Sequence, residues 1–157
     1  MAGGMAKQGL VPVFAVYSSF LQRGYDQLLQ DVALDGLHVV LGVDRAGLVG
    51  ADGETHHGCF DALYLSQVPH MTVLCPASFA ELRQMLRRAV LELTGPVAVR
   101  YPRGGEGAYQ DCCGNETFTQ VRPGADCTIL TYGVLINEAL AAAELLHEAG
   151  VETRVVK

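Results

Sequence analysis

The sequence lacks the features that mark several broad classes of protein. It has no basic excess, because 11 lysines and arginines face 17 aspartates and glutamates, and its net charge is −6. A nucleic-acid partner usually requires a basic face, so we expect none. No apolar run approaches the roughly 18 residues of a membrane span, so we expect no membrane partner. The N-terminus also lacks the basic and apolar segments of a secretory signal.

The cysteines form no recognisable framework. They stand at positions 59, 75, 112, 113 and 127, so their number is odd, and no pair has CxxC spacing. This favours reduced thiols and a cytoplasmic location. No histidine partner is indicated for any of them, and we expect small buried side chains rather than nucleophiles.

The apolar residues that are present predict an α/β fold. Continuous apolar runs at 11–16, 37–43, 71–74 and 96–99 are typical of parallel strands covered on both faces. Helical spacing of apolar residues follows from Phe20, with Ser18 or Ser19 as a candidate cap, and from Ser78, where Ser78 and Glu81 form a capping box. We therefore expect a mostly parallel sheet with helices on both faces.

Changes in composition divide the chain. Residues 1–103 are expected to form one domain, truncated at its N-terminus because residues 1–8 resemble the end of a helix. Residues 104–122 are polar and rich in turn formers, and they predict a linker. Residues 123–157 predict the truncated start of a second α/β domain. Its expected elements are a strand at 127–132, a helix at 137–149 and a strand at 151–156.

Polar residues concentrate just after the predicted strands, where parallel sheets bind ligands. The first strand is followed by Tyr17, Phe20 and Arg23. A helix start with free N–H groups, together with an arginine fork, suits a phosphate. The alternative is an ordinary capped helix with Phe20 in the core and Arg23 in solvent.

The second strand leads into a long glycine-punctuated segment, residues 44–58. It contains Arg45, Asp52 and two histidines, and histidine is the usual proton carrier near neutral pH. The segment could instead be a flexible surface loop, or hold a metal through His56, His57 and Cys59.

The fourth strand ends at a third candidate, Arg103, which follows Tyr101 and Pro102. Arg103 could complete a phosphate clamp with Arg23, or it could form a structural salt bridge. These patterns predict a site for an anionic ligand and do not name a reaction.

Three motifs carry a family resemblance. They are YSSFLQRGYDQ at 17–27, DRAGLVGADGETHHG at 44–58 and VRYPRG at 99–104. They resemble the pyrimidine-domain motifs of the 1-deoxy-D-xylulose-5-phosphate synthase family, transketolase-like enzymes that use thiamine diphosphate and Mg²⁺. The resemblance is strong over residues 1–103 and weaker beyond them. It implies a homodimeric enzyme that condenses pyruvate with D-glyceraldehyde 3-phosphate and releases CO₂, which supplies isoprenoid, thiamine and pyridoxal synthesis.

The resemblance also implies roles for individual residues. Phe20 matches the aromatic residue that stacks on the cofactor's aminopyrimidine ring. His56 matches a histidine near the reacting carbonyl and hydroxyl groups, and Asp52 lies in the same loop. These two are the expected catalytic residues. The expected phosphate-binding residues are Tyr17, Arg23, Arg45 and Arg103. No metal ligand is expected in this chain.

Two alternatives accompany this interpretation. The chain could belong to another thiamine-diphosphate enzyme, either a transketolase or the β subunit of a 2-oxo acid dehydrogenase, although clustered arginines favour a phosphorylated acceptor. It could also be a non-catalytic regulatory domain of this fold. The resemblance places an activating glutamate and the magnesium-binding GDG motif upstream of residue 1. We therefore expect the isolated chain to be inactive.

Overall fold

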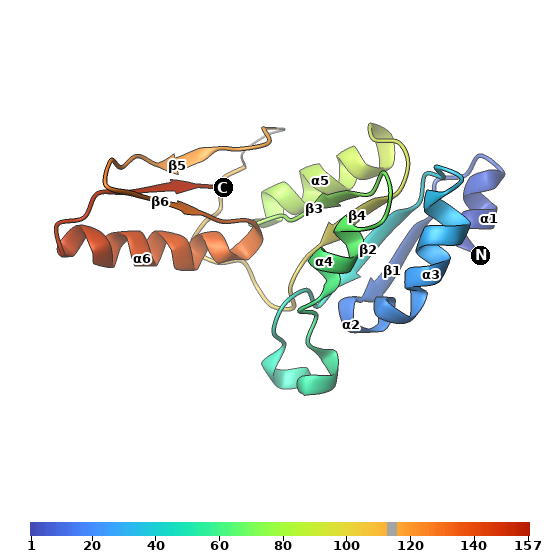
Figure 1. The fold of residues 1–157 in the computed structure, drawn as a ribbon, viewed down its shortest axis with the longest axis horizontal. Helices are drawn as coiled ribbons and strands as arrows, with labels where there is room; N and C mark the ends of the chain where they lie inside the picture. The colour runs from blue at the N-terminus through green and yellow to red at the C-terminus, as the bar shows by residue number, and fades with distance from the viewer. Residues whose placement is uncertain (113–115) are drawn as a thin grey trace. The chain divides into compact units, whose positions relative to one another are not determined.

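The computed structural model describes residues 1–112 and 116–157 (Figure 1). The chain forms two compact units. The first comprises Met1–Leu74 and Met85–Gly104, and the second comprises Cys75–Gln84 and Gly105–Lys157. Cys113, one member of the adjacent cysteine pair, lies outside the described residues.

The first unit contains a parallel four-stranded sheet. Its strands are β1 (Val13–Tyr17), β2 (Val40–Asp44), β3 (Thr72–Leu74) and β4 (Val97–Arg100), in the order β1-β2-β4-β3. All three pairings are parallel, which confirms the expected fold class. Each strand begins later than its apolar run, and three of the four extend into a polar or aromatic residue at the carboxyl end.

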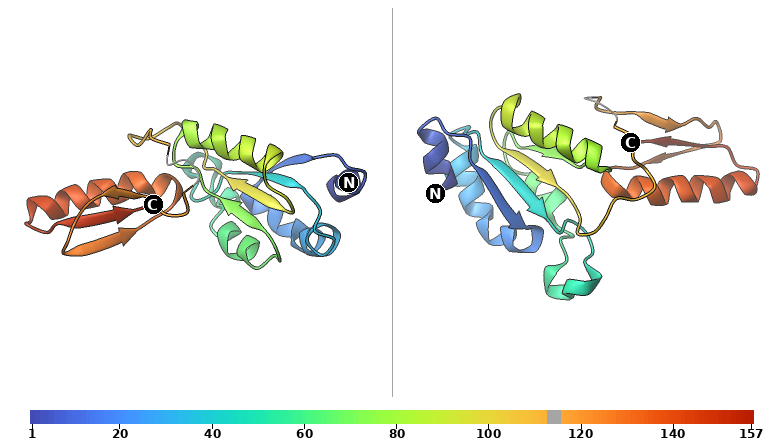
Figure 2. Two further views of the ribbon diagram at one scale, coloured as in Figure 1. Left: turned by 90° about the horizontal axis from the view of Figure 1, so that it is seen from above. Right: turned by 180° about the vertical axis from the view of Figure 1, so that it is seen from behind.

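Helices cover both faces of this sheet. α5 (Phe79–Leu91) lies on one face, while α3 (Tyr25–Leu28) and α4 (Asp61–Ser66) lie on the other (Figure 2). Leu21, Leu28 and Val32 pack with Leu41 and other strand residues in one buried cluster. The central strands β2 and β4 are almost wholly buried for this reason, which explains their continuous apolar sequence.

The segment after β1 stays helical but changes its hydrogen-bond pattern along its length. It runs through α2 (Ser18–Leu21), a 3-10 turn η1 (Gln22–Gly24), α3 and a π-helical turn η2 (Leu29–Ala33). Gly24, a poor helix former, marks one break with φ −94° and ψ 5°. The expected serine cap is wrong, because Tyr17 is the N-cap residue and Ser18 and Ser19 have no hydrogen-bond partner for their hydroxyls.

The start of α5 confirms the predicted capping box. The backbone N–H of Glu81 donates to Ser78 Oγ at 3.1 Å, and Glu81 Oε2 accepts from the backbone N–H of Ala77 at 2.8 Å. The glutamate thus reaches one residue further back than in the usual box, in which it contacts the N-cap itself. A short helix α1 (Ala2–Lys7) precedes β1.

The second unit contains a three-stranded sheet in the order β5-β7-β6 and the helix α6 (Ile136–Glu148), preceded by η5 (Gly133–Leu135). β6 (Cys127–Leu130) is parallel to β7 (Thr153–Val156), and β5 (Gln120–Arg122) is antiparallel to it. β5 lies inside the stretch 104–122 that was expected to be a linker. The domain boundaries at 103 and 123 stay predictions.

Two further expectations concern the surface. Cys59, Cys112 and Cys127 are free and exposed and Cys75 is free and partly buried, so the expected burial of the cysteines is wrong for these four. Within the described residues, none of the helices combines the length and apolarity needed to cross a bilayer.

Candidate functional site

Strand register brings the predicted site residues to one edge of the first sheet. Tyr17 of β1 pairs with Asp44 of β2, and Val43 pairs with Arg100 of β4. The alignment continues past the strands, because the backbone N–H of Ala46 donates to the carbonyl of Tyr101 at 3.0 Å. The segments that follow β1, β2 and β4 therefore leave the sheet at the same level.

Three rings form an aromatic cluster at this edge. The Tyr17 and Phe20 rings stack at a centroid distance of 5.3 Å, and the His56 ring lies edge-on to Phe20 at 5.2 Å. Phe20 is 51% exposed. The alternative that placed Phe20 in the core is therefore wrong, and its ring remains accessible to a planar partner.

Two arginines and two aspartates form an ionic cluster beside these rings. Asp52 bridges the arginines, with Oδ2 at 2.9 Å from Arg45 Nε and Oδ1 at 2.7 Å from Arg103 Nη1. Asp44 accepts from Arg45 Nη1 at 2.5 Å and from the Arg45 backbone N–H at 2.6 Å. Burial lowers the pKa of Arg45, but the hydrogen bond to Asp52 and the charge of Asp44 outweigh it, and the net shift is upward.

Arg45 joins the ionic cluster to the aromatic cluster. Its guanidinium carbon lies 3.8 Å from the centroid of the Tyr17 ring, a cation–π contact. Its backbone has φ 58°, in the left-handed region that non-glycine residues rarely adopt. Such conformations persist only where surrounding contacts enforce them. Here the side chain is held by Asp44, Asp52 and Tyr17.

Six of the seven predicted site residues thus lie in one connected group, which consists of Tyr17, Phe20, Arg45, Asp52, His56 and Arg103. The seventh, Arg23, lies in η1 with an exposed side chain. Among the described residues its side chain forms no ion pair or hydrogen bond. The arginine that shares a carboxylate with Arg103 is therefore Arg45, and a role for Arg23 in phosphate binding stays a prediction.

The loop that carries Arg45, Asp52 and His56 is closed on itself. Gly47 and Gly58 exchange two backbone hydrogen bonds, at 2.9 and 2.8 Å. His57 Nδ1 accepts from the backbone N–H of Val49 at 3.0 Å, so this histidine braces the loop. Within the described residues, no group of three or more His, Cys, Asp or Glu side chains could hold a metal.

Several residues that support the candidate site were not predicted from the sequence. Asp61 at the start of α4 makes two contacts with Arg100 at the end of β4, and Tyr64 donates to the carbonyl of Ser18 at 3.2 Å. Burial raises the pKa of Tyr64, and the charge of Asp61 adds to the shift. Burial also raises the pKa of Tyr101, again helped by a nearby carboxylate, that of Asp44. An acid in the first turn of a helix was the only sequence signal for Asp61.

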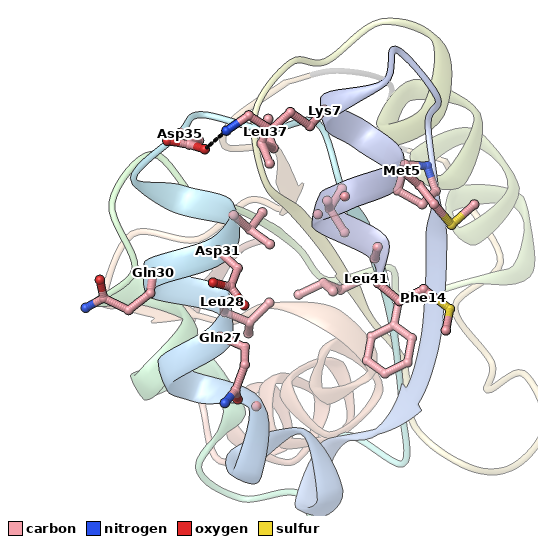
Figure 3. Close-up of a pocket in the computed structure, with 18 of the residues that line it drawn as sticks. Met5, Lys7, Phe14, Gln27, Leu28, Gln30, Asp31, Asp35, Leu37 and Leu41 are labelled. Carbon is pink, nitrogen blue, oxygen red and sulfur yellow. Dashed lines mark hydrogen bonds and ion pairs between the residues drawn. The ribbon is translucent and has the colours of Figure 1, made fainter.

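A groove of about 690 Å³ lies elsewhere in the first unit, between α1, β1 and the helical segment that contains α3 (Figure 3). Apolar side chains including Met5, Phe14, Leu28 and Leu41 line it, and the Lys7–Asp35 ion pair stands at its border. None of the seven predicted site residues is among its lining residues in the described part of the chain. The chemistry-bearing residues converge at the strand ends, which makes that edge the better candidate.

Comparison with protein families gives two matches. The family described as "Transketolase, pyrimidine binding domain" matches residues 1–106, and the family described as "Transketolase, C-terminal domain" matches residues 117–157. Among curated proteins, the 1-deoxy-D-xylulose-5-phosphate synthase of Chlorobaculum tepidum is 50% identical over 98% of this chain and 25% of its own length. The synthase of Halalkalibacterium halodurans is 48% identical over 99% of this chain and 26% of its own length. The chain thus spans about a quarter of these relatives.

Solved structures agree with the family matches. A split-gene transketolase, solved as an inactive β4 tetramer, superposes with a TM-score of 0.86 at 28% identity, over 99% of this chain and 51% of that one. The transketolase of Campylobacter jejuni also superposes with a TM-score of 0.86, at 20% identity, over 99% of this chain and 25% of that one, which supports the fold alone. Since the first family match covers most of the chain, the chain belongs to the transketolase pyrimidine-binding-domain family.

Proposed function

We propose that this chain is part of a 1-deoxy-D-xylulose-5-phosphate synthase. The complete protein would condense pyruvate with D-glyceraldehyde 3-phosphate, release CO₂ and form 1-deoxy-D-xylulose 5-phosphate. The observation that carries the proposal is the ionic cluster in which Asp52 joins Arg45 to Arg103, next to the rings of Tyr17 and Phe20. Identities near 50% with synthases support it further.

We assign the acceptor's phosphate to the arginines. Arg103 has a side chain that is 44% exposed and ends in a planar fork of donors that matches a phosphate. Arg45 is held against the Tyr17 ring and presents a second positive charge at the same edge. Arg23, on the helical segment after β1, is proposed as a third contact that forms when the acceptor binds.

The residues at this edge fit an aromatic cofactor. Phe20 offers a half-exposed ring in α2, the helix that follows β1, and an aminopyrimidine could stack on it. When bound, thiamine diphosphate supplies the electron sink for decarboxylation, while the protein orients the reactants. We propose that the Mg²⁺ ligands lie in another part of the complete protein.

His56 is proposed to move a proton at the acceptor's carbonyl oxygen. Its ring lies against Phe20, and its Nδ1 is 3.0 Å from Thr55 Oγ1, a contact that orients the ring. Histidine is suited to this task near neutral pH. Asp52 was predicted as a second catalytic residue, and its contacts with Arg45 and Arg103 suggest that it also acts through these arginines.

We further propose that the complete protein is a cytoplasmic homodimer. The exposed, unpaired thiols of Cys59, Cys112 and Cys127 are compatible with a reducing compartment. The isolated 157-residue chain should not turn over pyruvate with the acceptor, because the resemblance places an essential glutamate and the diphosphate-binding region upstream.

Steady-state kinetics on the complete protein would test the proposal, with each substrate varied in turn. Arg103→Ala and Arg45→Ala should each lower the acceptor kcat/KM by roughly 30- to 1000-fold, because each removes one charge-assisted phosphate contact. The pyruvate KM should change much less, since decarboxylation requires only pyruvate and the cofactor. Arg103→Lys should restore activity only in part, because an ammonium group cannot present a planar fork.

Arg87→Ala is the matched control, because Arg87 is an exposed arginine on α5 outside the ionic cluster. It should leave both substrate constants near those of the unsubstituted protein. Normal acceptor constants in the Arg45 and Arg103 variants, or an equal loss for pyruvate, would show that these arginines are structural.

A further inference from the structure

The ionic cluster carries no net formal charge. Arg45 and Arg103 contribute two positive charges, and Asp44 and Asp52 contribute two negative ones. A phosphate dianion that approached this arrangement would be attracted by the arginines and repelled by both carboxylates. Strong phosphate binding therefore requires that one carboxylate give up its arginine.

The two carboxylates are held to different degrees. Asp44 ends β2, and its two oxygens accept from the backbone N–H and the guanidinium of Arg45. Asp52 lies in η3 (Gly50–Asp52), and its carboxylate oxygens accept hydrogen bonds from the side chains of Arg45 and Arg103. A rotation of the Asp52 side chain would break these bonds without disturbing a strand.

The Asp52–Arg103 bond is the weaker half of the bridge. The Arg103 side chain is 44% exposed, whereas that of Arg45 is 18% exposed and also contacts Asp44 and Tyr17. Exposed ion pairs contribute little, because water screens them and holding two side chains in place costs entropy. A phosphate that offers several charge-assisted acceptors can therefore replace the carboxylate at Arg103.

We propose that Asp52 is an internal counterion that occupies Arg103 until the acceptor's phosphate displaces it. The inference rests on the proposed phosphate site and adds a specificity role to it. A dianion gains about twice as much Coulomb energy from the released arginine as a monoanion does. A phosphate dianion can therefore displace Asp52 from Arg103, whereas a carboxylate monoanion such as pyruvate cannot. This difference keeps the donor substrate out of the acceptor position.

The test is direct binding of inorganic phosphate to the complete protein by calorimetry, without turnover. Asp52→Asn, which keeps the shape and removes the charge, should tighten phosphate binding by about 3- to 30-fold. The gain should shrink at high ionic strength. Asp52→Glu, which keeps the charge, should stay within about twofold of the unsubstituted protein and shows whether the loop tolerates substitution.

Glu54→Gln is the matched control for net charge. Glu54 is an exposed acid in the same loop, and its removal changes the overall charge equally. It should alter the phosphate dissociation constant by less than about twofold, since its charge is screened by water. A gain equal to that of Asp52→Asn would mean that general electrostatics, and not the bridge, is responsible.

Kinetics provide a second readout that separates the roles of Asp52. In Asp52→Asn the acceptor KM should fall, and pyruvate should become a competitive inhibitor against the acceptor. A raised acceptor KM with weaker phosphate binding would show instead that Asp52 positions the arginines. An unchanged acceptor KM with a lower kcat would show a purely chemical role for Asp52. Either of these two results would contradict the proposed counterion role.

The arginine variants separate this inference from the proposed function. If Arg103→Ala and Arg45→Ala weaken phosphate binding but Asp52→Asn does not strengthen it, only the counterion role fails. If the unsubstituted protein binds no phosphate, or if the arginine variants bind it normally, the phosphate site itself is wrong.

Discussion

Asp61 and Arg100 form a two-point ion pair beneath the candidate site. Asp61 Oδ2 lies 3.0 Å from Arg100 Nε, and Oδ1 lies 2.9 Å from Arg100 Nη2. The Asp61 side chain is fully buried and that of Arg100 is 13% exposed. The pair ties the first residue of α4 to the last residue of β4, and so fixes the edge of the sheet from which Tyr101 and Arg103 emerge.

Breaking this pair should destabilise the chain far more than breaking an exposed one. Asp61→Ala leaves the Arg100 charge without its main partner, and loss of one partner of a buried pair costs about 3–5 kcal/mol. Asp35→Ala removes the exposed Lys7–Asp35 pair and should cost about 0–1 kcal/mol. Urea unfolding followed by circular dichroism measures both losses. Equal losses would mean that burial adds nothing to the Asp61 contact.

Gly58 should not tolerate a side chain. A Cβ placed there would lie 2.4 Å from Ser18 Oγ and 2.3 Å from the Arg45 carbonyl oxygen, which belongs to the backbone and cannot turn away. Gly58→Ala should therefore cost about 1–3 kcal/mol or more and loosen the hydrogen bonds between Gly47 and Gly58. Gly50→Ala is the control, because nothing lies within 4 Å of its Cβ position. Thermal unfolding of the two variants should differ clearly, and similar midpoints would contradict the close approach at Gly58.

His57 is expected to act through the loop rather than through chemistry. Val49 is buried, and its N–H donates to His57 Nδ1. His57→Phe leaves this donor unpaired and should cost about 1–3 kcal/mol, whereas His57→Asn can keep an acceptor near the same place and should cost less. Chemical unfolding of both variants tests the ranking. A phenylalanine variant as stable as the asparagine variant would show that the hydrogen bond is not needed.

Much of the fold follows from local sequence patterns. The runs that became β2 and β4 are continuous and apolar because helices cover both of their faces, so their burial is visible in the sequence. β5 could not be found this way. It is three residues long, polar at Gln120 and Arg122, and it exists because it pairs with β7 at the far end of the chain.

The candidate site, like the fold, could be predicted from the sequence only in part. Residues after β1, β2 and β4 could be expected to converge, because parallel strands bring their carboxyl ends to one edge. The bridge that Asp52 forms between Arg45 and Arg103 could not be predicted. Asp52 and Arg103 are 51 residues apart in the sequence, and the position of the Arg45 side chain depends on the left-handed backbone at that residue. Arg23 lies in a 3-10 turn with its side chain exposed, which agrees with the alternative that placed it in solvent.

The final prediction concerns stability at alkaline pH. Burial, helped by nearby carboxylates, raises the pKa of both Tyr64 and Tyr101, so the folded chain holds these phenolic protons more tightly than the unfolded chain, whose tyrosines titrate near pH 10. The folded state then binds more protons, and linkage requires the free energy of unfolding to fall as the pH rises. This stabilisation is complete below about pH 10 and is lost as the pH climbs toward the raised folded values.

Urea unfolding between about pH 8 and about pH 11 should show this decline, with tyrosinate absorbance rising as the chain unfolds. Tyr64→Phe should lower stability at neutral pH by about 0.5–1.5 kcal/mol, because it removes the hydrogen bond to the Ser18 carbonyl. The same variant should show a shallower alkaline decline, since one of the linked protons is gone. An unchanged slope in Tyr64→Phe combined with Tyr101→Phe would mean that groups other than these two phenols cause the alkaline loss.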